Sequence, residues 1–145
     1  MFCKLAILLP LLVSFVASED PRFIFNGFRS ANLSLDGIAE ITPNGLLRLT
    51  IDTRQQKGHA FYLNSISFKK SLNGIASSFS TTFVFAIISE YPTLSGHGIA
   101  FVVAPTRALL GALPSQYLGL FNESNNGNAT NHIVAIELDT VEIYI

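Results

Sequence analysis

The sequence is short of cysteine, tryptophan and charge. It has one cysteine, Cys3, and no tryptophan, and only 13% of its 145 residues are Asp, Glu, Lys or Arg. A single cysteine excludes an internal disulfide. Nucleic acids and anionic membrane surfaces are recognised by clusters of Lys and Arg, and the chain contains no such run. We therefore expect neither of them as a partner.

Residues 1–18 have the pattern of a secretory signal peptide. Lys4 gives a positive charge near the start, residues 5–16 are apolar, and the small residues Val16 and Ser18 suit a cleavage site after residue 18. Removal of this segment leaves 8 basic and 10 acidic residues, a formal net charge of −2. No later stretch is long and apolar enough to span a bilayer. These features predict a secreted protein, or a cell-surface protein if the chain is part of a longer receptor.

Three Asn-x-Ser/Thr sequons agree with secretion. They place candidate glycosylation sites at Asn32, Asn122 and Asn128. Two of them lie in the polar segment 122–131, whose composition predicts an exposed loop.

The rest of the chain consists of short segments rich in Phe, Ile, Val and Thr, bounded by Gly, Asn, Pro or Ser. This pattern predicts strands at residues 23–25, 33–41, 46–51, 60–63, 79–88, 98–104 and 133–140. Tight turns are expected at 43–45 and 72–74, and a loop with at most one helical turn at 106–113. Strands without intervening helices predict an all-β sandwich or jelly roll.

The two longest apolar runs, 79–88 and 133–141, are expected to be central strands covered on both faces. The second run carries two carboxylates, Glu137 and Asp139, which would emerge on the same face of a strand. Like charges at such a position need a reason, because buried charge is costly unless it is paired or bound to metal. A bound cation, acid/base chemistry and simple exposure to water all remain open at this point.

Four stretches resemble the legume (L-type) lectin domain, and more narrowly the lectin ectodomain of plant receptor kinases. They are residues 59–62 (HAFY), 78–85 (SFSTTFVF), 96–105 (GHGIAFVVAP) and 134–140 (VAIELDT). They occur in the family's order and extend from residue 23 to about residue 141. The resemblance implies a concanavalin-like jelly-roll sandwich that binds carbohydrate beside a manganese and a calcium ion.

On this resemblance, Glu137 is a ligand of the transition metal and Asp139 bridges it to calcium. Carboxylate oxygens suit both hard cations. The family's further ligands follow these two residues, and they do not occur before Ile145. We therefore expect residues 19–145 to be the N-terminal portion of such a domain, with an incomplete metal set. A homo-oligomer, or completion by another chain, remains open.

The resemblance also implies a sugar site at His97, Gly98 and Gln116. His97 stands where the family has a saccharide-binding Asp, and a neutral imidazole offers one donor and one acceptor in place of a charged double acceptor. Gln116 lies in the segment 115–119 (SQYLG), where the family usually has Gly-Gly before Tyr/Phe-Leu-Gly. Two other histidines, His59 and His132, lack ligand spacing and are expected to be structural.

These observations predict a carbohydrate-binding module without catalytic activity. One alternative is the ectodomain fragment of a lectin receptor kinase with a signalling role, any kinase domain lying beyond this chain. Another is a β-glucan hydrolase of related fold, because Glu137-x-Asp139-x-x-Glu142 resembles the acidic strand of that family. Against the hydrolase, the chain has no tryptophan to stack on sugars, and the other three stretches resemble lectins.

Overall fold

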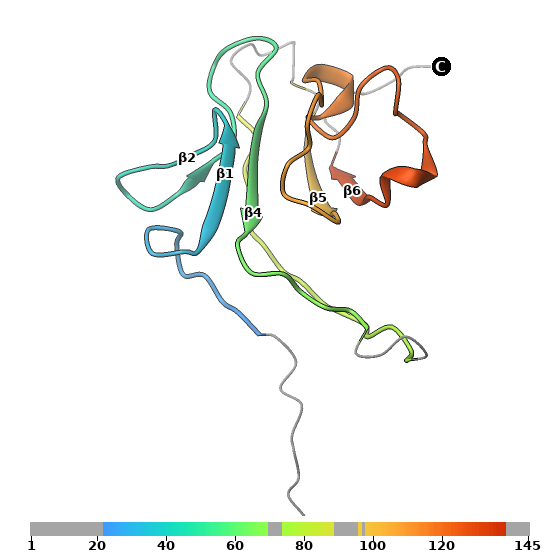
Figure 1. Cartoon of the computed structure of the whole chain (residues 1–145). Helices are drawn as coiled ribbons and strands as arrows, with labels where there is room; N and C mark the ends of the chain where they lie inside the picture. Colours follow the sequence, from blue (N-terminus) through green and yellow to red (C-terminus); the bar gives the residue numbers. More distant parts are fainter. Residues whose placement is uncertain (1–21, 70–73, 89–95, 97, 139–145) are drawn as a thin grey trace, which may run out of the picture.

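The computed structural model of the chain describes residues 22–69, 74–88, 96 and 98–138 and is built from strands and loops (Figure 1). The predicted signal peptide, His97, Asp139 and residues 72 and 73 of the predicted turn lie outside the described residues. The elements are β1 (Leu33–Gly37), β2 (Glu40–Ile41), β3 (Leu47–Arg48), β4 (Gly58–Tyr62), β5 (Ile99–Val103), β6 (Val134–Leu138) and the 3₁₀ turns η1 (Ser115–Tyr117) and η2 (Ala129–Asn131). The predicted all-β class is confirmed.

The strands form three antiparallel pairs. In the β1–β4 pair Leu33 lies opposite Tyr62, and in the β5–β6 pair Ile99 lies opposite Leu138. The β2–β3 pair is a small hairpin. In the described part of the chain, no helix is long and apolar enough to cross a membrane.

The predicted 43–45 turn closes the β2–β3 hairpin. The amide of Gly45 donates to the carbonyl of Thr42 (2.8 Å), and the amide of Thr42 donates to the carbonyl of Leu46 (2.9 Å). Gly45 has φ +87°, a conformation that costs glycine little. The turn prediction is therefore confirmed.

The prediction of a central strand at 79–88 is wrong. The segment forms no strand, and all of its residues are exposed. Phe79 and Phe83 lie beside Phe101 of β5, and their ring centroids are 6.3 and 6.0 Å from the ring centroid of Phe101. The segment thus approaches β5 through its rings, but a strand also needs a hydrogen-bonding neighbour for its backbone.

The run 133–141 is also not a strand covered on both faces where it is described. β6 pairs with β5, and Val134 and Ile136 are 65% and 59% exposed. Among the described residues no further strand lies beside β6. The strand expected at 23–25 is absent from the structure. The one expected over 33–41 is divided into β1 and β2, which pair with different strands, and the one over 46–51 is shortened to β3.

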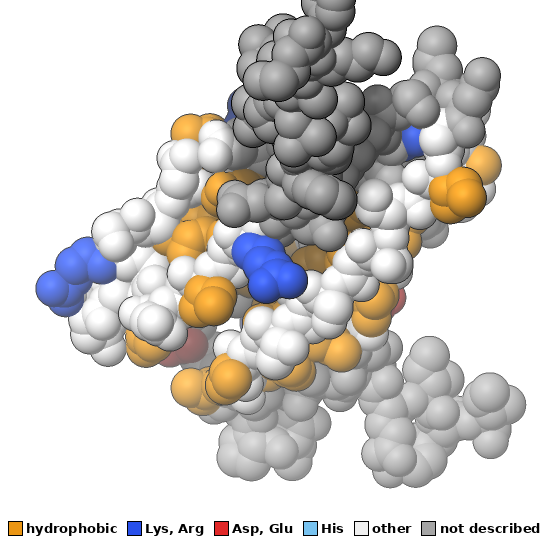
Figure 2. All heavy atoms as spheres, turned by 90° about the horizontal axis from the view of Figure 1, so that it is seen from below, with side chains coloured by type: hydrophobic (Ala, Val, Ile, Leu, Met, Phe, Trp, Pro, Cys, Tyr) orange, Lys and Arg blue, Asp and Glu red, His pale blue; other side chains and the backbone are white. Residues whose placement is uncertain are grey.

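The well-buried part of the described structure lies where a loop closes over β4. Ala112, Gly119 and Leu120 of this loop are buried, as is His59 of β4. Elsewhere apolar side chains remain accessible, and Figure 2 shows them spread between isolated Lys and Arg side chains on the face seen from below. This loop over β4 positions the candidate site.

Candidate carbohydrate site

The loop 112–121 is closed by its own backbone. The amide of Leu113 donates to the carbonyl of Phe121 (2.7 Å), and the amide of Gly119 donates to the carbonyl of Leu113 (2.8 Å). Between these bonds η1 turns the chain, and it ends at Leu118 and Gly119 with φ +49° and +74°. Consecutive left-handed residues reverse the chain sharply and bring Gly119 back onto the sheet.

Lys57 and His59 fasten this loop to the sheet. The Nζ of Lys57 donates to the carbonyl oxygen of Ala112 (2.6 Å), and Nε2 of His59 lies 2.8 Å from the carbonyl oxygen of Gly119. His59 lies on β4 and Lys57 directly precedes this strand, and both side chains reach the loop. A Cβ on Gly119 would lie 2.6 Å from His59 Nε2 and 3.3 Å from Lys57 Cβ, which shows how closely the loop is held.

His59 is also tied to the neighbouring strand. Its Nδ1 lies 3.0 Å from Oδ2 of Asp36, which faces it across the β1–β4 ladder. The hydrogen bond from His59, followed by one from the backbone of Gly37, holds the pKa of the Asp36 carboxyl below its ordinary value of 3.8. The imidazole thus links β1, β4 and the loop.

A hollow of about 330 Å³ opens beside η1. It is lined by Gln55, Leu113, Pro114, Ser115, Gln116, Tyr117 and Glu123. The lining offers two amides, a hydroxyl, a carboxylate and an aromatic ring. Polar groups that both donate and accept, next to an aromatic or apolar face, match the hydroxyls and the apolar faces of a sugar ring. Of the predicted sugar residues, Gln116 lies in this hollow.

Two other predicted residues that the structure describes, Gly98 and Glu137, lie toward one end of the β5–β6 ladder. Gly98, with φ +110°, comes directly before β5, and Glu137 lies on β6 opposite Ala100. In Figure 1, η1 lies toward this same end of the ladder. No described contact joins Gln116 to Gly98 or Glu137. His97 and Asp139 are outside the described residues, so their positions stay predictions.

The described donors do not make up a metal site. Glu137 is exposed and supplies one carboxylate. Within the described ranges, no three His, Cys, Asp or Glu side chains lie close enough together to hold an ion. Calcium takes six to eight oxygen ligands, so Glu137 by itself does not fit the implied ions.

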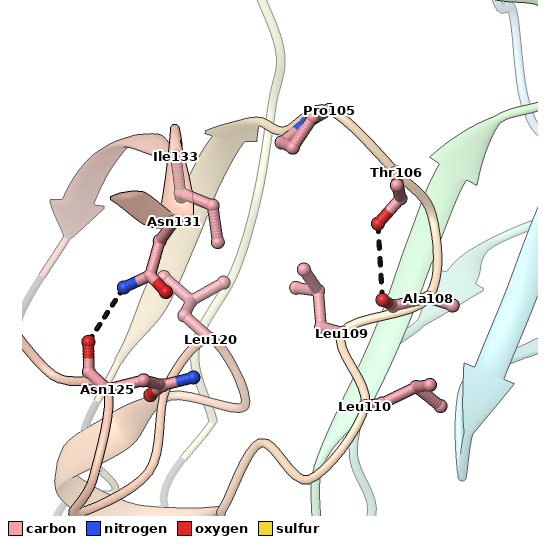
Figure 3. Close-up of a pocket in the computed structure, with 9 residues that line it drawn as sticks. All are labelled: Pro105, Thr106, Ala108, Leu109, Leu110, Leu120, Asn125, Asn131 and Ile133. Carbon is pink, nitrogen blue, oxygen red and sulfur yellow. Dashed lines mark hydrogen bonds between the residues drawn. The ribbon is translucent and has the colours of Figure 1, made fainter. Parts of the chain in front are cut away.

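A second hollow, of about 240 Å³, lies at the opposite end of the ladder (Figure 3). It lies between the loop that follows β5 and Ile133, which precedes β6. Its lining combines Leu109, Leu120 and Ile133 with Thr106, Asn125 and Asn131, and Nδ2 of Asn131 donates to the carbonyl of Asn125 (2.7 Å). Neither Gly98 nor Gln116 lines it, so it holds none of the predicted sugar residues that the structure describes.

The three sequons differ in structure. Asn32 is exposed just before β1. Asn128 is exposed and caps η2, its Oδ1 accepting from the amide and hydroxyl of Thr130 (2.9 and 2.8 Å). Asn122 is half-buried, and its Nδ2 donates to the carbonyl of Gly111 (3.2 Å). A glycan is therefore accommodated more easily on Asn128 than on Asn122.

Sequence reasoning missed Lys57 and Asp36 and found only the structural character of His59. No local motif marks these residues. Asp36 and His59 meet because of the strand register, and His59 and Gly119 are 60 residues apart in the sequence.

Comparison with known proteins agrees with this geometry. The family model described as the legume lectin domain matches residues 20–144. L-type lectin-domain containing receptor kinases IV.2 and IV.1 of Arabidopsis thaliana are 62% and 58% identical to this chain over 128 and 127 residues. L-type lectin-domain containing receptor kinase SIT2 of Oryza sativa subsp. japonica is 53% identical over 126 residues.

These matches cover 86–87% of this chain but 19% of each receptor kinase, so the chain spans about a fifth of their length. The predicted resemblance, to the lectin ectodomain of plant receptor kinases, is confirmed. The chain belongs to the legume lectin domain family, a family of non-catalytic carbohydrate-binding domains.

Proposed function

We propose that this chain is an extracellular carbohydrate-recognition module and that the hollow at η1 forms part of its sugar site. The observation that carries the proposal is the position of Gln116. Gln116 is exposed in the middle of η1 and lines a polar hollow. It belongs to a loop that two side chains hold to the sheet. A fixed loop that presents an amide loses little conformational entropy when a ligand binds.

The proposed site extends from Gln116 toward His97 and Gly98 at the start of β5. Glu137 and Asp139 would contribute to a calcium and manganese site at the same end of the ladder, together with ligands from elsewhere. A single good hydrogen bond is worth roughly 0.5–1.5 kcal/mol. Loss of the Gln116 amide should therefore weaken sugar binding by up to about tenfold.

A glycan array tests this proposal with the full chain. Binding is measured with calcium and manganese and again with EDTA, for the wild type, Gln116→Ala and Asn126→Ala. Asn126 is exposed and does not line the hollow, so it is a matched polar control. Weaker binding by the Gln116 variant alone would support the site. Binding that is equal in both variants, or absent from every glycan, would overturn it.

A receptor role is proposed as well, because the relatives are L-type lectin-domain containing receptor kinases. In that role the module would present a ligand to a kinase encoded beyond residue 145. Transcripts that continue into a membrane segment and a kinase would support it. The hydrolase alternative predicts that the chain cleaves a β-glucan and that Glu137→Gln abolishes the cleavage; the family match gives it no support.

A further inference from the structure

His59 is the buried polar side chain of the described structure, with 7% of its surface exposed. Both of its ring nitrogens lie within hydrogen-bonding distance of an oxygen. Nδ1 faces the carboxylate of Asp36 at 3.0 Å, and Nε2 faces the carbonyl of Gly119 at 2.8 Å.

When Asp36 is ionised, both partner oxygens can accept a hydrogen bond but cannot donate one. A neutral imidazole has one N–H donor and one lone pair, whereas the imidazolium has two donors. The neutral ring can therefore satisfy Asp36 or Gly119 but not both, and its lone pair then faces an oxygen at close range. The protonated ring donates to both and links β1 to the loop.

The loop held in this way carries the proposed sugar contacts. Gly119 lies three residues after Gln116 in the same turn, and the amide of Leu118 donates to the carbonyl of Ser115 (2.9 Å). A shift of Gly119 away from His59 is thus transmitted to the turn that bears Gln116.

We propose that His59 is a positioning residue for carbohydrate binding: its protonated ring locks the loop 112–121, and the site loosens as the ring becomes neutral. This inference rests on the proposed function of the hollow at η1. Imidazole changes charge between about pH 5 and 8. Sugar affinity and protection of the loop amides should therefore both fall as the pH rises through this range.

Other charged groups near the ring bear on this behaviour. The lowered pKa of Asp36 keeps its carboxylate ionised through the range in question, so this partner can only accept a hydrogen bond from the ring. Lys57 approaches the same loop and is bonded to the carbonyl of Ala112. Lys57 therefore holds the Ala112 end of the loop through a bond that does not involve the imidazole.

Amide hydrogen exchange of the full chain tests the lock without any ligand. The amides of Leu118, Gly119 and Leu120 are followed at about pH 5.5 and about pH 8, with correction for the intrinsic pH dependence of exchange. Protection should fall by about fivefold or more at the higher pH. His132→Asn, which removes an exposed histidine at a left-handed position, is the control and should behave like the wild type.

Two substitutions separate proton dependence from packing. His59→Arg keeps a permanent charge and should abolish the pH dependence of loop protection. His59→Gln carries a neutral amide at every pH, with one NH₂ group that donates and one oxygen that only accepts, so its loop protection should not change with pH. If both variants fail to fold, the ring signals of His59 in the wild type still report whether both nitrogens carry hydrogen at low pH.

Glycan-array binding at the same two pH values completes the test. Affinity that falls in step with loop protection supports the inference. Loop protection that does not change with pH overturns it, as does sugar binding that is independent of pH. If protection changes but no glycan binds at either pH, the loop lock stands and the proposed function fails.

Discussion

The Gly119→Ala substitution gives the most direct test of how the loop is seated. An alanine at φ +74° is strained by roughly 1–2 kcal/mol, because an L side chain is disfavoured in the left-handed region. Its Cβ would also lie 2.6 Å from Nε2 of His59, so the buried ring must move away from the Gly119 carbonyl. Leaving a buried polar group without its partner costs about 1–3 kcal/mol. The total destabilisation should be about 2–5 kcal/mol.

Gly127→Ala is the matched control. Gly127 has φ +75°, almost the same conformation, and a Cβ there would meet nothing within 4 Å. Both substitutions restrict the unfolded chain equally, so the difference between them reports the contacts of the new Cβ with His59 and Lys57. Urea unfolding of the full chain, followed by circular dichroism, measures both. Equal destabilisation by the two variants would refute the close seating of the loop on His59.

Further predictions concern acid stability, ring packing and glycan attachment. The pKa of Asp36 is lowered on folding, so the ionised carboxylate stabilises the fold above pH 3.8, the ordinary pKa, and this stabilisation is lost as the pH falls through the folded-state pKa. Asp36→Asn should therefore flatten the acid limb of a curve of unfolding free energy against pH. An acid limb that is unchanged in this variant would contradict the prediction. Phe83→Ala should destabilise the chain by roughly 1–2 kcal/mol through loss of its contact with β5, whereas Val84→Ala, at a fully exposed residue, should leave the urea midpoint unchanged. In a secretory host, mass spectrometry should find a glycan on Asn128 more often than on Asn122, and the reverse order would count against the contacts described for Asn122.

The sequence predicted three strands from segments rich in apolar and aromatic residues. β4, β5 and β6 lie within two residues of their expected bounds, and the Gly45 turn closes the hairpin as expected. The sequence could not predict the state of residues 79–88. Their Phe and Val content favours a strand, but a strand also depends on a neighbour with free amides and carbonyls, and that depends on the tertiary structure.

The candidate site was predictable only through the family resemblance. Gln116 was identified because its segment occupies the place of a sugar-binding loop. Lys57 and Asp36 were not identified, because their roles depend on strand register and on a loop far along the chain. A histidine without a nearby ligand pattern gave no sign that both of its nitrogens would face oxygen atoms.

The loop 112–121 is held at two points by bonds of different kinds. At Ala112 the donor is a lysine, and at Gly119 it is an imidazole. Loss of a proton from the imidazole would therefore free one end of the loop while the other end stays attached. Because Gln116 lies between the two points and nearer to Gly119, its position would change before the loop detached. On the proposed role of His59, these two attachments would let the proposed sugar site change while β4 and β1 remain paired.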